Sequence, residues 1–244
     1  MEQEDFSKYN GEGTTLRKAA VKVASNLGLY KWCVKIDTRF KEKKMAKAFH
    51  QFGLETLVEA DKVVSSFGGK MFLAFGTLLG AYRNKNFIPY DCDIDVGLLA
   101  TERPDNMTEL MKKSGFCLKK QLYFKTSNTL IEEQYEFKGV GIDFFYYFQN
   151  ENEEMFTYIT QRHEFKDWRE ANKSDGFPAI KKICPTTSFS KQKFLDHSFY
   201  FPDKTVEWLS CLYGKNFMVP DPNWSMNDHK KFAQSVTDRV YRRQ

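Results

Sequence analysis

The sequence lacks several features that would assign it to a familiar class of protein. No apolar run approaches the roughly 18 residues that a membrane-spanning helix needs, and the longest candidate, residues 71–82, contains two glycines. The five cysteines are odd in number and form no Cys-x-x-Cys pair, which argues against a zinc ribbon and against a disulfide framework. The first five residues are acidic and polar rather than apolar, so no secretory signal is recognised there. We therefore expect a cytoplasmic protein in a reducing compartment, with membrane association left open.

The sequence has what a globular protein needs. Its 244 residues are 41% hydrophobic and 16% aromatic, which is enough to bury a sizeable core and argues against disorder. The four histidines have no mutual spacing typical of a metal site or a catalytic triad. Chemistry in this chain is therefore expected to rest on other residue types.

Positive charge is concentrated near the N-terminus. Residues 17–47 contain ten Lys or Arg and two acids, a local charge of +8 in a chain whose net charge is +5. Such an excess attracts anions, so an anionic membrane surface is one candidate partner for residues 17–47. The plainer interpretation is the solvated face of helices. No zinc or helix-turn-helix pattern accompanies the charge, so nucleic acid is not expected as a partner.

Hydrophobic periodicity predicts a helical start followed by mixed strands and helices. Helices are expected over 14–27, 41–67, 77–82, 106–114 and 203–213, and strands over 30–36, 70–75, 93–99, 116–124, 130–137, 140–148 and 155–159. The C-terminal third looks less regular. This order predicts an α+β fold, with a helical N-terminal region, residues 1–67, packed on a catalytic core, residues 68–244.

One segment combines features of a phosphate site. An apolar strand ends at Gly76-Thr77 and is followed by a short helix. Glycine permits close backbone approach, and the free N–H groups of a helix N-terminus favour a phosphate. Arg83, just beyond, can add a bidentate contact. A Gly-Thr turn before a helix is weak evidence alone, because many such turns only cap the helix.

Carboxylates follow on two apolar strands. Asp93 and Asp95 are two residues apart in one predicted strand and so share a face, and Asp91 adds an acid just upstream. Asp143 stands in an otherwise apolar strand, where burial is costly unless the group is paired or bound to metal. If the two strands are neighbours, three acids form a cluster suited to Mg²⁺ or Mn²⁺. The alternatives are a surface Asp-x-Asp loop and a solvent-facing Asp143 on an edge strand.

At these residues the chain resembles the LicD/fukutin family of phosphotransferases, which have the nucleotidyltransferase fold. The matching segment runs from Gly76 to Asp95 and continues at Gly141-Ile-Asp-Phe-Phe145 and at Tyr213-Gly…Val219-Pro220. Bacterial members typically carry Trp-Asp-Asp-Asp-Ile-Asp, where this chain has Tyr90-Asp-Cys-Asp-Ile-Asp95. The resemblance implies a mixed β-sheet flanked by helices.

The resemblance also implies an activity. Family members transfer a phosphorylated alcohol, such as phosphocholine or ribitol phosphate, from a CDP-linked donor to a glycan hydroxyl and release CMP. The resemblance assigns the family's roles to residues of this chain. Asp93 and Asp95 would bind Mg²⁺, and Asp143 would bind metal or accept the proton of the acceptor hydroxyl. The donor phosphates would be held by Gly76, Thr77 and Arg83. Two alternatives stay open, a nucleotidyltransferase that acts on a small molecule and a non-catalytic module that binds glycans or cations.

Overall fold

The computed structural model describes residues 30–152, 154–161, 168–221 and 233–243, with side chains from residue 43 onward. The chain divides into two compact units, residues 1–47 and 48–244. The helix expected over 14–27 lies outside the described residues. None of the helices described is long and apolar enough to cross a membrane.

The first described element is the long helix α2, Tyr30–Ser66. The strand expected over 30–36 is therefore wrong, because these residues form the first turns of α2. Helix propagation adds one hydrogen bond for each residue fixed, and this gain outweighs the modest strand preference of isolated β-branched residues. Within the second unit, α2 buries Phe49, Leu57, Ala60 and Val64 in the main core.

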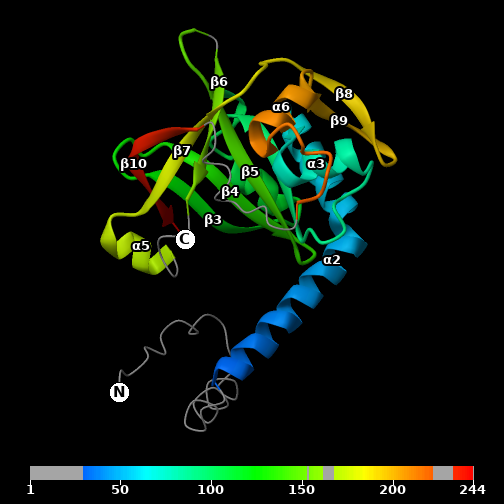
Figure 1. Cartoon of the computed structure of the whole chain (residues 1–244), viewed down its shortest axis with the longest axis vertical. Coiled ribbons are helices and arrows are strands. Elements are labelled where there is room, and N and C mark those ends of the chain that lie inside the picture. The colour runs from blue at the N-terminus through cyan, green and yellow to red at the C-terminus, as the bar shows by residue number, and fades with distance from the viewer. Residues whose placement is uncertain (1–29, 153, 162–167, 222–232, 244) are drawn as a thin grey trace. The chain divides into compact units, whose positions relative to one another are not determined.

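Ten strands form one mixed sheet, whose spatial order is β4-β3-β10-β7-β6-β5-β2-β1-β9-β8 (Figure 1). The strands are β1 (Phe72–Leu73), β2 (Asp93–Leu99), β3 (Cys117–Phe124), β4 (Leu130–Phe137), β5 (Val140–Gln149), β6 (Met155–Thr160), β7 (Phe177–Ile183), β8 (Phe189–Phe194), β9 (His197–Pro202) and β10 (Gln234–Arg243). Two neighbouring pairs, β2–β5 and β1–β9, are parallel, and the other pairs are antiparallel. The predicted α+β class and mixed sheet are confirmed.

Six of the strands close into a ring, which the sequence analysis did not predict. β4 pairs with β5 as well as with β3, so the order β5-β4-β3-β10-β7-β6 returns to β5. One edge of β5 serves both ends of the ring, because β4 pairs with residues 140–145 and β6 with residues 147–149. The other edge of β5 carries β2 and, through it, β1, β9 and β8.

The remaining helices are α3 (Phe75–Arg83), the 3₁₀ helix η2 (Ala100–Glu102), α4 (Met107–Lys113), α5 (Trp168–Ser174) and α6 (Thr205–Tyr213). The main core contains residues of α2, α3, α4, α6 and the strands around β5. A second apolar cluster lies within the ring, where Phe124 of β3 meets Tyr158 of β6 with ring centroids 4.7 Å apart. Buried residues of β2 and β5 belong to the main core, which therefore holds this strand pair in place.

Candidate active site

Three aspartates come together on β2 and β5. The two strands run parallel, with Asp95 directly opposite Asp143 and Asp93 opposite Gly141. Residues two apart in a strand share a face, and neighbouring strands lie about 4.8 Å apart, so the three carboxylates project from one face. Asp143 is only 7% exposed, which excludes the solvent-facing edge residue considered as an alternative. The strands are neighbours, as the predicted acidic cluster required.

The turn before α3 brings backbone amides to this cluster. Phe75, the first residue of the helix, has φ of 37°, a left-handed conformation that is costly for a residue other than glycine. Its ring is buried and packs on Phe145, with centroids 4.4 Å apart. The next residue, Gly76, donates its N–H to Oδ2 of Asp95 at 2.9 Å. The strained turn thus places a backbone donor on a predicted metal ligand.

Gly76 occupies a position that has little room for a side chain. A Cβ atom there would lie 3.2 Å from Asp95 Oδ2 and 3.3 Å from Asp91 Oδ2. Two carboxylates therefore converge on the face of this residue. Glycine is favoured at position 76 by this close approach of the two carboxylates, because any larger residue would need them to shift.

Thr77 is placed differently from the role predicted for it. Its side chain is buried, and Oγ1 accepts a hydrogen bond from the backbone N–H of Asp95 at 2.9 Å. The contact fixes the start of α3 against β2. Its contribution to donor phosphate binding stays a prediction.

The acids raise one another's pKa. Burial, with the neighbouring Asp93, raises the pKa of Asp91 to about 7, although the charge of Arg83 acts in the opposite direction. Burial also raises the pKa of Asp95 well above its ordinary value, and the charges of Asp93 and Asp143 add to this effect. Closely spaced carboxylates that cannot all ionise freely are typical of a site that receives a cation.

A cavity of about 480 Å³ opens beside the acids. Gly76, Arg83 and Asp91 contribute to its polar lining, and Arg83 also donates from Nη1 to the carbonyl oxygen of Phe217 at 3.3 Å. The other lining residues are mostly apolar or aromatic: Leu79, Ile88, Tyr90, Tyr213, Asn216, Phe217, Val219, Pro220 and Asp221. A volume of this order accommodates a small-molecule ligand. The structure thus brings two of the three predicted donor-binding residues to one cavity.

The acidic residues fit a hard divalent cation in charge and in donor type. Among the described residues, no three acidic, histidine or cysteine side chains are already grouped to hold an ion. Mg²⁺ commonly takes one or two carboxylates and completes its shell with water and substrate phosphates. Asp93 and Asp95 can supply those carboxylates, since they share a face of β2 and experience mutual repulsion that a cation would relieve.

Sequence reasoning missed several residues of this region. Asp91 was noted as a further acid but was given no role, and Tyr213 and Val219 were quoted only for the family resemblance. Lys120 of β3 was not considered at all, although it lies 3.8 Å from Asp143 Oδ2 and 2.5 Å from Glu132 Oε1. Its alternation with Leu122 and Phe124 was the available signal, because it places a charge among buried apolar residues.

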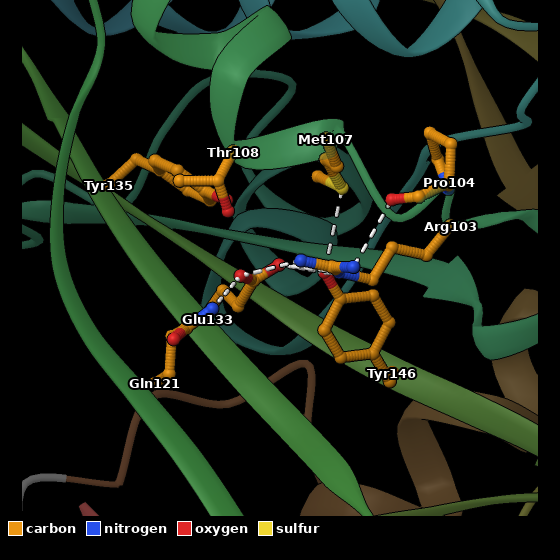
Figure 2. A network of polar contacts seen from close by, with 8 residues as sticks. All are labelled: Arg103, Pro104, Met107, Thr108, Gln121, Glu133, Tyr135 and Tyr146. Carbon is orange, nitrogen blue, oxygen red and sulfur yellow. Dashed lines mark hydrogen bonds and ion pairs between the residues drawn. The ribbon is translucent and has the colours of Figure 1, made fainter. Parts of the chain in front are cut away.

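A second polar network lies on the opposite face of the same strands (Figure 2). The guanidinium of Arg103 binds both carboxylate oxygens of Glu133, at 2.9 and 3.1 Å. Gln121 donates to Glu133 at 2.6 Å, and the hydroxyl of Tyr146 donates to it as well. Gln134 of β4 lies opposite Asp143, and the next residue along, Glu133, points to the other face of the sheet because side chains alternate along a strand. The network therefore supports β4 and β5 on the face opposite the aspartates.

Comparison with known proteins finds a family model that is similar to the region of the site. Residues 68–183 match the family model described as LicD/FKTN/FKRP, nucleotidyltransferase domain. The match includes Gly76, Arg83 and the three predicted aspartates. Residues 68–183 of this chain are therefore similar to the nucleotidyltransferase domain of the LicD/FKTN/FKRP family.

Curated relatives agree with the family match. The chain is 27% identical over 204 residues to the ribitol-5-phosphate transferase FKTN of Macaca fascicularis and, equally, to that of Homo sapiens. The protein of the same name from Mus musculus is 25% identical over 204 residues. Each match covers 78% of this chain and 41% of the relative. The chain thus spans about two fifths of the length of these relatives.

Proposed function

We propose that this chain is a phosphotransferase that depends on a divalent metal, Mg²⁺ or Mn²⁺. It would transfer a phosphorylated alcohol from a CDP-linked donor to a glycan hydroxyl and release CMP. The observation that carries the proposal is the register of β2 and β5, which sets Asp143 opposite Asp95 beside Gly76. The family model that matches residues 68–183 and the names of the relatives support it and make ribitol phosphate the first group to test.

The residues of the chain take different parts in this reaction. The cavity would receive the donor, whose phosphates would lie against Gly76 and the guanidinium of Arg83. Asp93 and Asp95 hold the ion, which when bound neutralises charge on the diphosphate. Asp143 lies one strand further, next to Asp95, where a carboxylate can accept the proton of an incoming hydroxyl.

Product release tests the proposal. The chain is incubated with CDP-ribitol and, separately, with CDP-choline, in the presence of Mg²⁺ or Mn²⁺ and with glycan acceptors. CMP and pyrophosphate are then quantified. We expect metal-dependent CMP release from one donor. Pyrophosphate release from a nucleoside triphosphate would instead indicate a nucleotidyltransferase, and metal or glycan binding without turnover would indicate a non-catalytic module.

A matched pair of variants assigns the reaction to the site. Asp95→Asn removes one charge with little change of shape and should reduce CMP release by at least about 100-fold, the scale of a lost catalytic group. Asp105→Asn makes the same change at an exposed aspartate outside the cluster and should leave the rate unchanged. Equal activity of Asp95→Asn and the wild type would refute the site assignment.

A further inference from the structure

A row of polar residues crosses four neighbouring strands at the level of the acids. Asp95 of β2 pairs with Asp143 of β5, Asp143 with Gln134 of β4, and Gln134 with Lys120 of β3. The row thus connects the predicted metal ligands to a buried lysine of β3. Its two ends carry opposite charge.

Lys120 is buried with both of its carboxylate neighbours. Its side chain is 8% exposed, and those of Glu132 and Asp143 are 3% and 9% exposed. The ammonium lies 2.5 Å from Glu132 Oε1, which anchors it, and 3.8 Å from Asp143 Oδ2. Burial of a charge is costly unless partners compensate it, so a requirement for solubility does not explain a lysine at position 120.

The adjacent lysine shows what a surface position looks like. Lys119 pairs with Glu136 at 3.1 Å, and the two side chains are 39% and 44% exposed. Exposed pairs of this kind contribute little to stability. The two lysines therefore offer the same charge in contrasting environments on one strand.

The surroundings of Asp95 and Asp143 also differ. Asp95 accepts a hydrogen bond from the Gly76 amide and lies close to Asp91, which lines the cavity. Asp143 instead faces the ammonium of Lys120, and neither Asp95 nor Asp143 lines the cavity. A carboxylate that already has a cationic neighbour gains less from a metal ion than one surrounded by other acids.

We propose that Lys120 is a positioning residue that holds the Asp143 carboxylate away from the metal and so reserves it as the proton acceptor. The inference rests on the proposed function. In the reaction, the acceptor oxygen forms a bond to the phosphorus that carries the alcohol, and the bond from that phosphorus to the CMP oxygen breaks. The hydroxyl proton passes to Asp143. Asp93 and Asp95 then form the metal site, and Lys120 decides which role Asp143 takes.

Magnesium titration and steady-state kinetics on full-length variants test this assignment. In Lys120→Met we expect Mg²⁺, measured by calorimetry without donor, to bind about tenfold more tightly, because a cation is lost and Asp143 can join the ion. The kcat for CMP release should fall at least about 100-fold, as when a general base is lost. The KM for the donor should stay within about threefold, because the cavity is unchanged. Lys119→Met should leave all three quantities unchanged, and Lys120→Arg should restore part of the kcat.

Two further results separate positioning from folding. The double variant Lys120→Met/Glu132→Gln removes the carboxylate that the single variant leaves buried without its cation. If the double variant regains the wild-type kcat, Lys120 serves only to neutralise Glu132 and the proposal is overturned. Unchanged or weaker Mg²⁺ binding in Lys120→Met overturns it as well. If the wild type transfers no phosphoalcohol, the proposed function fails, and the magnesium titration still decides whether Lys120 restrains Asp143.

Discussion

At the scale of single residues, the site is a concentration of negative charge that the fold tolerates at a cost. Burial and the neighbouring Asp93 raise the pKa of Asp91 to about 7, and burial together with Asp93 and Asp143 raises the pKa of Asp95 well above its ordinary value. The folded chain therefore binds protons on these groups more tightly than the unfolded chain does. Between the ordinary pKa of 3.8 and the folded value, their contribution to stability decreases as the pH rises.

This cost predicts how Asp91 affects thermal stability without metal. Asp91→Asn cannot ionise at position 91, so its Tm lacks this pH dependence. On going from pH 6 to pH 8 without metal, the Tm of the wild type should therefore change in the unfavourable direction relative to the Tm of the variant. At pH 8 the variant should be more stable by a few degrees. Mg²⁺ should narrow the difference, because a bound cation offsets the repulsion. Thermal unfolding followed by circular dichroism measures all three effects, and identical pH profiles for the two proteins would contradict the raised pKa.

The sequence analysis predicted the acidic residues of the candidate site from local patterns in the chain. Asp93 and Asp95 were predicted from their i, i+2 spacing, and Asp143 from its isolation in an apolar strand. Lys120 could not be found in this way, because its role depends on a register across three strand pairs rather than on its neighbours in the chain. The role of Gly76 in the convergence of Asp91 and Asp95 likewise depends on tertiary structure.

At the scale of elements, the contacts behind β4 and β5 fix the strands that carry the acids. Burial alone would raise the pKa of Glu133, but the hydrogen bond and charge of Arg103 hold it below its ordinary value. Glu133 is fully buried, and the Arg103 side chain is 15% exposed. Removal of either side chain would leave the charge of its partner buried and uncompensated, so both are needed for stability.

Breaking this pair should destabilise the protein strongly. We expect Arg103→Met to reduce the free energy of unfolding by about 3–5 kcal/mol, the usual cost of removing one partner of a buried ion pair. The exposed pair between Lys138 and Glu55, 2.6 Å apart, is the control. Glu55→Gln should cost less than about 1 kcal/mol. Urea unfolding of the two variants measures both values, and similar losses would contradict a structural role specific to the Arg103 network.

The strands up to β6 were predicted, and the described strands after β6 were not. The strand expected over 93–99 coincides with β2, and the strands expected over 116–124, 130–137 and 140–148 agree with β3, β4 and β5 to within one residue. All four described strands that follow β6 were missed. β8 and β10 are rich in polar residues, and β8 lies at the edge of the sheet, whereas β7 and β9 are largely apolar but lie in the C-terminal third, where the pattern looked irregular. Such strands are stabilised by pairing with neighbours far away in the sequence, and local patterns do not record that pairing.

At the scale of the whole molecule, the closure of the ring determines what the chain needs in order to fold. β10 pairs with β3 on one side and with β7 on the other, so the end of the described chain joins strands from two earlier regions. The sequence predicted an α+β chain but not this closure, since residues 234–243 show little hydrophobic alternation. The ring also places Lys120 inside the protein, and thus connects the architecture to the proposed chemistry.

The location of the domain boundary gives a prediction for the chain as a whole. The sequence analysis placed the boundary after residue 67, whereas residues 48–244 form a compact unit. Between the two positions, α2 contributes Phe49, Leu57, Ala60 and Val64 to the main core, each at most 2% exposed. We expect a fragment of residues 48–244 to unfold cooperatively at a Tm close to that of the full chain.

A fragment of residues 68–244 should fail to fold, because it loses these side chains together. Each large apolar side chain removed from a core costs about 2–5 kcal/mol, and several such losses exceed the 5–15 kcal/mol that stabilises a typical domain. Circular dichroism and differential scanning calorimetry on both fragments measure the outcome. A cooperative transition in residues 68–244 would show that the catalytic core begins where the sequence pattern placed it. Its absence, beside a stable fragment of residues 48–244, would make the second half of α2 an integral part of the domain that carries the acids.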